Sequence, residues 1–227
     1  MIQKFELINK KNLTNDVFEL VFKWEKELEI KPWQFITFLI DKIWWRAYSI
    51  LKIEWKNIIL IIKKRELNEW WRWWSKFICD LNIWEILKWV WPAWHFILKE
   101  NTNNKLFIWT GTWFVPLYNQ IIWSINTNKN LKLKLIFWVR EEKDLFYIDE
   151  LELIKEKNIN FSYEIFLSRD DLKWTNKWYV TDYINKENII NKFDEFYICW
   201  TPNMIESSIK KLIQIWISEN NIYFEKY

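Results

Sequence analysis

Apolar residues in the first part of the chain come in short runs, and polar residues separate the runs at the spacing of hairpins. The runs are rich in Ile, Phe and Val, which favours strands over helices. The predicted strands are residues 5–8, 17–22, 35–40, 47–50, 58–62 and 96–98. Residues 75–81 are ambiguous and also fit a short helix. A series of about six strands without long helices favours a closed antiparallel barrel over residues 1–98.

After a polar linker at residues 99–105, buried strands alternate with helical segments. Strands are predicted at residues 106–108, 131–139, 161–167 and 195–199. Helical patterns occupy residues 116–125 and 204–215, and an amphipathic segment lies at residues 149–155. This alternation predicts an α/β domain with a doubly wound parallel sheet over residues 106–227. A barrel followed by such a sheet suggests two cofactors, one for each domain.

The composition is unusual, because the chain has 21 tryptophans and one glycine. Average usage of about 7% would give roughly 16 glycines in a chain of this length. Several tryptophans stand where turns are expected, such as Trp33 after Pro32 and the cluster at residues 70–74. We therefore expect that most of them are glycines in the living protein, written as Trp because a UGA codon read as glycine was translated as tryptophan. The alternative is a non-catalytic, Trp-rich binding module, although the spacing matches neither a strand nor a helix period.

Other features of the composition exclude several classes of protein. The net charge of +3 and the lack of a basic cluster argue against nucleic-acid binding. No apolar run reaches the ~18 residues of a membrane span, and the N-terminal residues do not resemble a signal peptide. Cys79 and Cys199 are far apart, which favours a reduced, cytoplasmic protein without a disulfide or an iron–sulfur cluster. No metal site is expected, and His95 is interpreted as an ordinary strand residue.

The first chemical motif is Arg46-Ala47-Tyr48-Ser49. A guanidinium can bind a diphosphate through two hydrogen bonds, and a tyrosine ring can stack on a flat heterocycle. The motif resembles the Arg-x-Tyr-Ser motif of the ferredoxin–NADP reductase superfamily. The resemblance implies that Arg46 and Ala47 lie against FAD, with Tyr48 on the isoalloxazine ring and Ser49 near its N5 atom. Read with glycine for Trp, residues 70–75 resemble the second flavin segment, in which Trp73, Trp74 and Ser75 would hold the diphosphate.

The second half carries matching segments for a pyridine nucleotide. Residues 109–116, read with glycine for Trp, resemble the nucleotide turn of the same superfamily, and residues 199–204 resemble its Cys-Gly-x-Pro-x-Met segment. Residues 84–96 and 137–150 also fit the superfamily pattern in order. The nucleotide-binding residues implied by the resemblance are Thr110, Gly111, Thr112, Trp113, Arg140, Ser168, Arg169, Tyr179, Cys199, Trp200 and Met204. Tyr227 is expected over the flavin, as in the aromatic tails of some members.

The resemblance covers essentially the whole chain and implies a six-stranded flavin-binding barrel followed by an NAD(P)-binding domain. It further implies an FAD-dependent oxidoreductase that passes hydride between NAD(P)H and FAD, with Tyr48, Ser49 and Cys199 at the reaction centre. Single electrons would go to a separate carrier of the ferredoxin or flavodoxin type. Alternatives are a reductase component of a multicomponent enzyme and a free-flavin reductase. The pair Ser168-Arg169 leans slightly toward NADPH, but NADH remains open.

Overall fold

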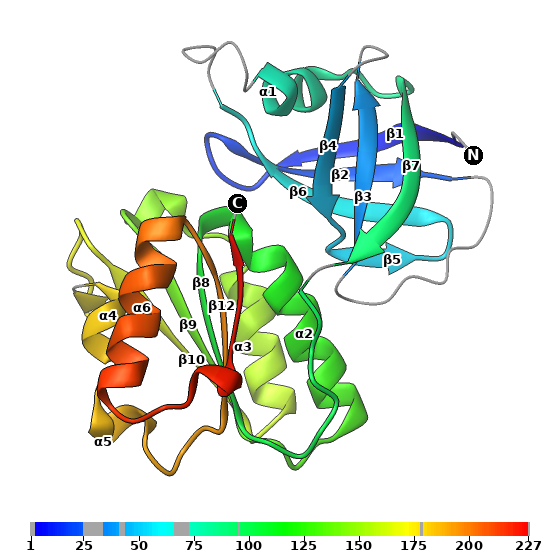
Figure 1. Cartoon of the computed structure of the whole chain (residues 1–227). Helices are drawn as coiled ribbons and strands as arrows, with labels where there is room; N and C mark the ends of the chain where they lie inside the picture. Colours follow the sequence, from blue (N-terminus) through cyan, green and yellow to red (C-terminus); the bar gives the residue numbers. More distant parts are fainter. Residues whose placement is uncertain are drawn as a thin grey trace. The chain divides into compact units, whose positions relative to one another are not determined.

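The computed structural model describes residues 3–24, 34–40, 44–65, 73–94, 96–177 and 179–226. The chain divides into two compact units, Met1–Ile97 and Leu98–Tyr227. The first unit is built on an antiparallel sheet, and the second on a parallel sheet covered by helices (Figure 1).

Seven strands and one helix form the first unit within the described residues. The strands run in the order β4-β3-β7-β1-β2-β6-β5, and every neighbouring pair is antiparallel. Their bounds are β1 Gln3–Asn12, β2 Val17–Lys23, β3 Gln34–Ile40, β4 Trp44–Ser49, β5 Lys52–Glu54, β6 Asn57–Lys63 and β7 Ile86–Trp94. Helix α1 spans Trp73–Asp80, so the ambiguous segment at residues 75–81 is helical.

Alternate residues of these strands form the core of the first unit, as the period of two requires. On β2, for example, Phe18, Leu20 and Phe22 are buried, whereas Lys23 is exposed. Helix α1 adds Ile78 and Cys79 to the same cluster. An amphipathic short helix therefore covers part of the buried face of the sheet.

The antiparallel architecture predicted from sequence is confirmed, but its closure into a six-stranded barrel is wrong. Among the described strands, β4 and β5 are the two edges of an open, barrel-like sheet. The Ile50 N–H bonds to the Gln34 carbonyl and extends the β4 edge, whereas the Leu51 N–H bonds to Ile59 and extends the β5 edge. Residues 50 and 51 thus connect the two edge strands, β4 and β5, which are not paired with each other.

The position predicted for the last strand of the first unit, residues 96–98, is also wrong. Residues 96–98 are not in a strand; the strand is β7, which includes Pro92. Its register to β3 shifts between Thr37↔Val90 and Phe35↔Ala93, so that two β7 residues face one on β3. Such a bulge accommodates a proline without loss of a ladder hydrogen bond.

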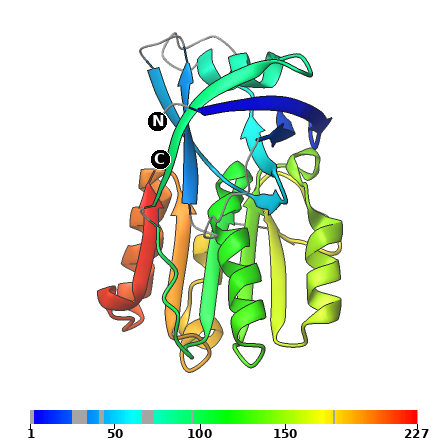
Figure 2. The ribbon, with the colours of Figure 1, turned by 90° about the vertical axis from the view of Figure 1, so that its right-hand side faces the viewer.

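The second unit contains a six-stranded sheet in the order β11-β10-β9-β8-β12-β13, and all neighbours are parallel. The strands are β8 Lys105–Thr110, β9 Leu133–Val139, β10 Phe161–Leu167, β11 Asn176–Lys177, β12 Glu195–Trp200 and β13 Ile222–Lys226. Figure 2 shows β13 in red at one edge beside β12 in orange. The doubly wound parallel sheet predicted from sequence is confirmed.

Helices lie on both faces of this sheet (Figure 1). The α-helices are α2 Phe114–Thr127, α3 Ile148–Lys157, α4 Val180–Tyr183, α5 Lys186–Ile189 and α6 Pro202–Gln214. Short 3-10 helices are η2 Gly111–Trp113, η3 Glu142–Asp144 and η4 Glu219–Asn221. Alternate strand residues such as Ile108 and Ile198 pack in one core cluster with Ile205 of α6. Strands buried on both faces read as continuous apolar runs, which is why their positions could be predicted.

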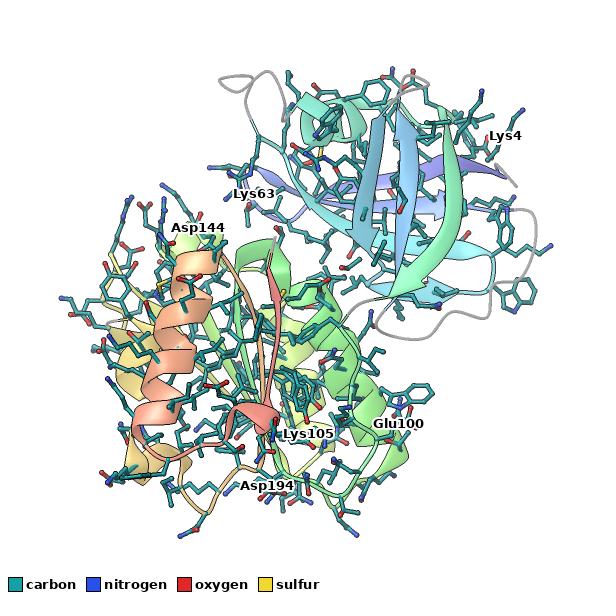
Figure 3. The ribbon with its side chains drawn as sticks, viewed as in Figure 1. Lys4, Lys63, Glu100, Lys105, Asp144 and Asp194 are labelled. Atoms are coloured by element: carbon teal, nitrogen blue, oxygen red, sulfur yellow. The ribbon has the colours of Figure 1, made fainter. Side chains whose placement is uncertain are left out.

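At the amino edge of the sheet, Lys105 begins β8 (Figure 3). Glu195 begins β12 and is the neighbour of Lys105 in register. The Lys105 Nζ lies 3.1 Å from the Glu195 Oε2, and the two side chains are only 1% and 3% exposed. The Lys105 ammonium also donates to Asn101 Oδ1 at 2.7 Å and to the Asn103 carbonyl at 2.9 Å. Each ammonium donor therefore has an acceptor.

The carboxylate of this pair is equally well satisfied. Its Oε1 accepts from the side-chain amides of Asn101 and Asn103, and its Oε2 accepts from the Tyr197 hydroxyl at 2.9 Å. Burial alone would raise the pKa of Glu195, but the two amides and the Lys105 charge outweigh it and hold that pKa below its usual value. The Tyr197 hydroxyl in turn accepts the Lys99 N–H at 3.0 Å. The network ties residues 99–105 to the sheet.

Candidate functional site

The carboxyl edge of the parallel sheet contains its topological switch point. From β8 the chain proceeds to β9 and β10 on one side, and later to β12 and β13 on the other side. In open parallel sheets, ligands bind outside the carboxyl ends of the strands at the point where the order reverses. This point lies between the ends of β8 and β12, at Thr110 and Trp200.

The end of β8 leads through one 3-10 turn directly into helix α2. Thr110 is extended and nearly buried, and Gly111 follows with φ +51°. A Cβ placed on Gly111 would meet no atom within 4 Å, so open space lies beside this backbone. The first N–H groups of an α-helix have no intrahelical acceptor, and they favour a phosphate. The turn and the start of α2 together suit a diphosphate.

The end of β12 enters helix α6 in a similar way. Thr201 precedes the helix, Pro202 is its first residue, and the N–H of Met204 bonds to the Thr201 carbonyl at 3.1 Å. Proline suits this position because its missing N–H would have no helical partner. The ends of β8 and β12 thus bring Thr110, Gly111 and Thr112 to the same edge as Trp200 and Met204.

Cys199 lies in β12 directly before this turn. Its neighbours in register are Trp109 on β8 and Glu225 on β13. The residue is completely buried, and burial, with a smaller contribution from the Glu225 carboxylate, raises the pKa of the thiol well above its usual value. The thiol is therefore neutral near pH 7, which excludes a thiolate nucleophile.

The Trp109 indole occupies the space beneath the turn. Its ring centroid lies 4.8 Å from that of Phe114 and 4.8 Å from that of Phe137. The side chain is fully buried, yet its indole N–H has no hydrogen-bond partner among the described residues. A buried donor without a partner costs about 1–3 kcal/mol. This position therefore holds a large, imperfectly accommodated side chain.

A second group of candidate residues lies at the ends of β9 and β10. The N–H of Ser168 bonds to the Val139 carbonyl, and the N–H of Arg169 bonds to the Arg140 carbonyl at 2.9 Å. Arg169 also donates from Nη1 to Glu141 Oε1 at 3.1 Å. The side-chain hydrogen bonds from Lys143 and Arg169 hold the pKa of Glu141 below its usual value.

Tyr179 joins this group through an aromatic contact. Its ring stacks on that of Trp138 with centroids 6.2 Å apart and an angle of 23° between the planes. Tyr179 is half exposed, so a flat ligand could reach it. Arg140, Ser168, Arg169 and Tyr179 are therefore gathered at one end of the carboxyl edge.

In the first unit, the candidate motif lies on the edge strand β4. The alternation of a strand places Arg46 and Tyr48 on one face and Ala47 and Ser49 on the other. The Arg46 guanidinium lies 5.0 Å from the centroid of the Trp74 ring, which is within the range of a cation–π contact. Tyr48 packs against the core, and burial raises the pKa of its hydroxyl, which stays protonated.

Ser75 lies in the first turn of α1, and its Oγ accepts the N–H of Arg65 at 3.2 Å. Arg46 thus lies beside Trp74 in the first turn of this helix, and Tyr48 packs against the core cluster that includes Trp74. Trp73, Trp113 and Trp200 are described only in their backbone. Residues 70–72, His95 and Tyr227 lie outside the described residues.

Two residues of the site were missed from the sequence. Glu141 pairs with Arg169, and Trp138 was treated only as a position in the nucleotide segment rather than as the partner of Tyr179. Glu141 could have been found, since it directly follows Arg140 at the end of a predicted strand. The Trp138–Tyr179 pair could not, because its members are 41 positions apart in the chain.

No group of three or more metal-ligating side chains occurs in the part of the chain that the structure describes. Among the same residues, no helix is long and apolar enough to cross a membrane.

One protein-family model matches most of the second unit. Residues 107–210 match the model of the oxidoreductase NAD-binding domain. This match includes the turn after β8, the ends of β9 and β10, and most of helix α6.

Curated relatives share part of their length with this chain. The toluate 1,2-dioxygenase electron transfer component of Pseudomonas putida is 28% identical over 136 residues, which cover 60% of this chain and 40% of that protein. A component of the Na(+)-translocating NADH-quinone reductase of Histophilus somni is 27% identical over 146 residues, or 60% of this chain and 35% of that component. The aligned region is less than half of either relative.

Among solved structures, the ferredoxin NADP+ reductase from Neisseria gonorrhoeae with bound FAD and NADP is similar over nearly the whole of both chains. The TM-score is 0.84 at 15% sequence identity, and the alignment covers 99% of this chain and 98% of that chain. At this identity, the similarity establishes the fold.

Proposed function

We propose that the protein is an FAD-dependent NAD(P)H oxidoreductase, because residues 107–210 match the model of the oxidoreductase NAD-binding domain and the whole chain has the fold of a solved ferredoxin NADP+ reductase. When bound, the nicotinamide supplies a hydride, and the flavin allows the two electrons to leave one at a time. The protein contributes binding, orientation and exclusion of water.

One observation carries this proposal. The positive-φ turn at Gly111 opens helix α2 at the switch point of an all-parallel sheet, inside the residues that match the oxidoreductase NAD-binding domain. The open space beside Gly111 fits a ligand that approaches the backbone closely. We assign Thr110, Gly111, Thr112 and Trp113 to the diphosphate of the nicotinamide nucleotide.

Other residues of the second unit would position the two ends of that nucleotide. Cys199 and Trp200 end β12 at the switch point, Met204 follows in α6, and the three residues would border the nicotinamide. The neutral thiol of Cys199 can pack against a ring without reacting with it. Tyr179 would stack on the adenine, near Arg140, Ser168 and Arg169.

In the first unit we assign the flavin to β4 and the start of α1. Arg46 supplies a cation for the diphosphate. Ser75 follows Trp73 and Trp74 in the first turn of α1. Ala47, Tyr48 and Ser49 complete the motif on the edge strand. The half-buried, protonated Tyr48 hydroxyl can serve only as a neutral hydrogen-bonding group. Tyr227 stays a proposed contact of the flavin ring.

The Glu141–Arg169 pair bears on the choice of nucleotide. A 2′-phosphate at Arg169 would have to displace the Glu141 carboxylate, which lies 3.1 Å away. Residues 140–144 and 168–171 together carry five carboxylates and three cations. This balance disfavours an added phosphate and suits a ribose diol. We therefore propose NADH as the better substrate, against the slight lean toward NADPH given by the Ser-Arg pair.

A ratio of specificity constants tests this choice. We expect a higher kcat/KM for NADH than for NADPH, and Glu141→Gln should raise the NADPH value by freeing Arg169. In Arg169→Ala, kcat/KM should fall only slightly for either nucleotide. A wild-type protein that prefers NADPH, together with a selective NADPH loss in Arg169→Ala, would instead assign Arg169 to the phosphate.

The electron acceptor is proposed from the relatives, one of which is named as an electron transfer component of a dioxygenase. We propose a separate one-electron carrier, of the ferredoxin or flavodoxin type. A reductase component of a multicomponent enzyme has the same chemistry and differs only in its partner. The buried, free cysteines Cys79 and Cys199 are consistent with a reducing compartment such as the cytoplasm.

The test of the function compares two versions of the chain: the printed one, and one with glycine at positions 73, 74, 109, 113 and 200. We expect the second version to bind FAD with a flavin absorbance spectrum and to reduce ferricyanide with NADH. Folded but colourless samples of both versions after incubation with FAD would contradict the proposal and favour a non-catalytic binding module.

A further inference from the structure

Three tryptophans in exposed turns have the positive φ that favours glycine. Trp55 has φ 61°, Trp84 has φ 78° and Trp216 has φ 74°. The one glycine of the chain, Gly111, has φ 51°. L-residues avoid this region because Cβ approaches the following carbonyl oxygen, and bulky side chains are genuine outliers there.

The first of these positions lies in the hairpin between β5 and β6. Glu54 pairs with Asn57, so Trp55 and Lys56 form a two-residue loop. Only the first of them has a positive φ. This is the pattern of a type II′ turn, whose first central residue is glycine.

The second position lies in the turn before β7. The N–H of Glu85 bonds to the Asn82 carbonyl at 3.1 Å, which closes a four-residue turn with Ile83 and Trp84 at its centre. A positive φ at the second central residue alone is the type II pattern, which requires glycine or asparagine there. Trp84 occupies that position.

The third position ends helix α6. The N–H of Ile217 bonds to the Leu212 carbonyl at 3.1 Å, and the N–H of Trp216 bonds to the Ile213 carbonyl at 3.0 Å. These two bonds define a Schellman motif, and the residue with positive φ after its C-cap is usually glycine. Ile217 packs in the same core cluster as Leu212, as this motif also requires.

The three indoles gain nothing that could compensate for the strain. They are 85%, 68% and 83% exposed at Trp55, Trp84 and Trp216. A tryptophan is normally among the most buried residues, because its area dominates packing. Three different turn types thus each have a glycine position, and a bulky tryptophan fills each of them.

We propose that the polypeptide made in its own cell has glycine at positions 55, 84 and 216, and that one codon read as glycine in that cell accounts for these tryptophans. The same codon then gives glycine at 109, 113 and 200. At position 109 this change removes the buried indole with the unpartnered N–H and leaves bare backbone beneath the turn. This last step rests on the proposed function; the three turns do not.

Mass spectrometry of the protein isolated from its source cells tests the proposal directly. Peptides that span residues 55, 84 and 216 should each be lighter than calculated by one Trp-to-Gly step. Tryptophan at any of the three positions would overturn the proposal.

A stability experiment on recombinant protein that has tryptophan at all of these positions gives an independent test. Trp55→Gly, Trp84→Gly and Trp216→Gly should each raise Tm, because glycine relieves the strain. The matched control is Trp174→Gly, since Trp174 is also exposed, at 56%, but has no positive φ; its Tm should not rise. Equal shifts in the control and the three variants would overturn the argument from backbone strain.

The two proposals can fail separately. If the native peptides contain glycine but the glycine version binds neither FAD nor NADH, the proposed function is wrong, and the proposal of glycine at these positions is confirmed. If the native peptides contain tryptophan, the proposal of glycine at these positions is wrong, whatever the activity of the protein.

Discussion

The two edges of the parallel sheet in the second unit differ in what their charged residues do. At the amino edge, Lys105 and Glu195 are buried and every polar atom of the pair has a partner. At the carboxyl edge, Arg169 and Glu141 also form an ion pair, but their side chains are 60% and 25% exposed. Figure 3 shows Lys105 and Asp194 at one end of the strands and Asp144 at the opposite end. A pair of one cation and one carboxylate is therefore shielded from solvent at one edge and accessible to solvent at the other.

The largest effect is expected from Glu195→Gln at the amino edge. The variant leaves the Lys105 charge buried without its counter-ion, which costs about 3–5 kcal/mol. The free energy of unfolding in urea measures this loss. NADH binding to the remaining folded protein should be unchanged, because the carboxyl edge is untouched. A loss below about 1 kcal/mol would mean that the pair is no stronger than a surface salt bridge.

A pH titration should reveal part of the same stabilisation. Because the folded-state pKa of Glu195 is lowered, its contribution is fully present above the unfolded value of 4.5 and is lost as pH falls through the lower folded value. The free energy of unfolding of the wild type, measured in urea, should fall over this acidic range. The free energy of unfolding of the Glu195→Gln variant should fall less. Parallel curves for the two proteins would contradict the assignment.

A smaller effect on stability is expected at the carboxyl edge from Gly111→Ala. The added Cβ has room, so the cost comes from the positive φ alone and is about 1–2 kcal/mol. Nucleotide affinity should fall as well, because the Cβ would occupy the space proposed for the diphosphate. The control is Thr127→Ala at the opposite end of α2, a residue outside the proposed site. If Gly111→Ala bound NADH as tightly as the wild type, the turn would not be the nucleotide site.

The smallest effect is expected from Glu141→Gln, which repeats the first substitution at the opposite edge. An exposed ion pair contributes about 0–1 kcal/mol, so the free energy of unfolding should barely change. The ratio of kcat/KM values for NADPH and NADH should nevertheless rise. A stability loss as large as that of Glu195→Gln would remove the distinction between the two edges.

The parallel sheet was predicted well from the sequence, whereas the antiparallel sheet was predicted only in part. Residues 161–167 were assigned to a strand and form β10 with the same bounds, because a strand buried on both faces has a continuous apolar run. Strand β5, Lys52–Glu54, is three residues long and has no such pattern. Strand β7 was obscured by Pro92, which is tolerated only because of a bulge that depends on β3.

The candidate site shows the same division. Gly111 and Arg169 could be identified in the sequence, because local motifs place them directly after strands. The partner of Arg169, the stacking of Tyr179 on Trp138 and the burial of Cys199 could not. Each depends on which strands become neighbours, and sequence spacing does not specify this.

By itself, the amino-acid sequence determined the alternation of strands and helices, the turn after β8 and the imbalance between glycine and tryptophan, since all of these are local or compositional. The tertiary structure alone decided that the first sheet stays open, that Lys105 and Glu195 meet at the amino edge, and which tryptophans have glycine conformations. The physical reason is that strand pairing, burial and the sign of φ at a turn are set by contacts between segments far apart in the chain.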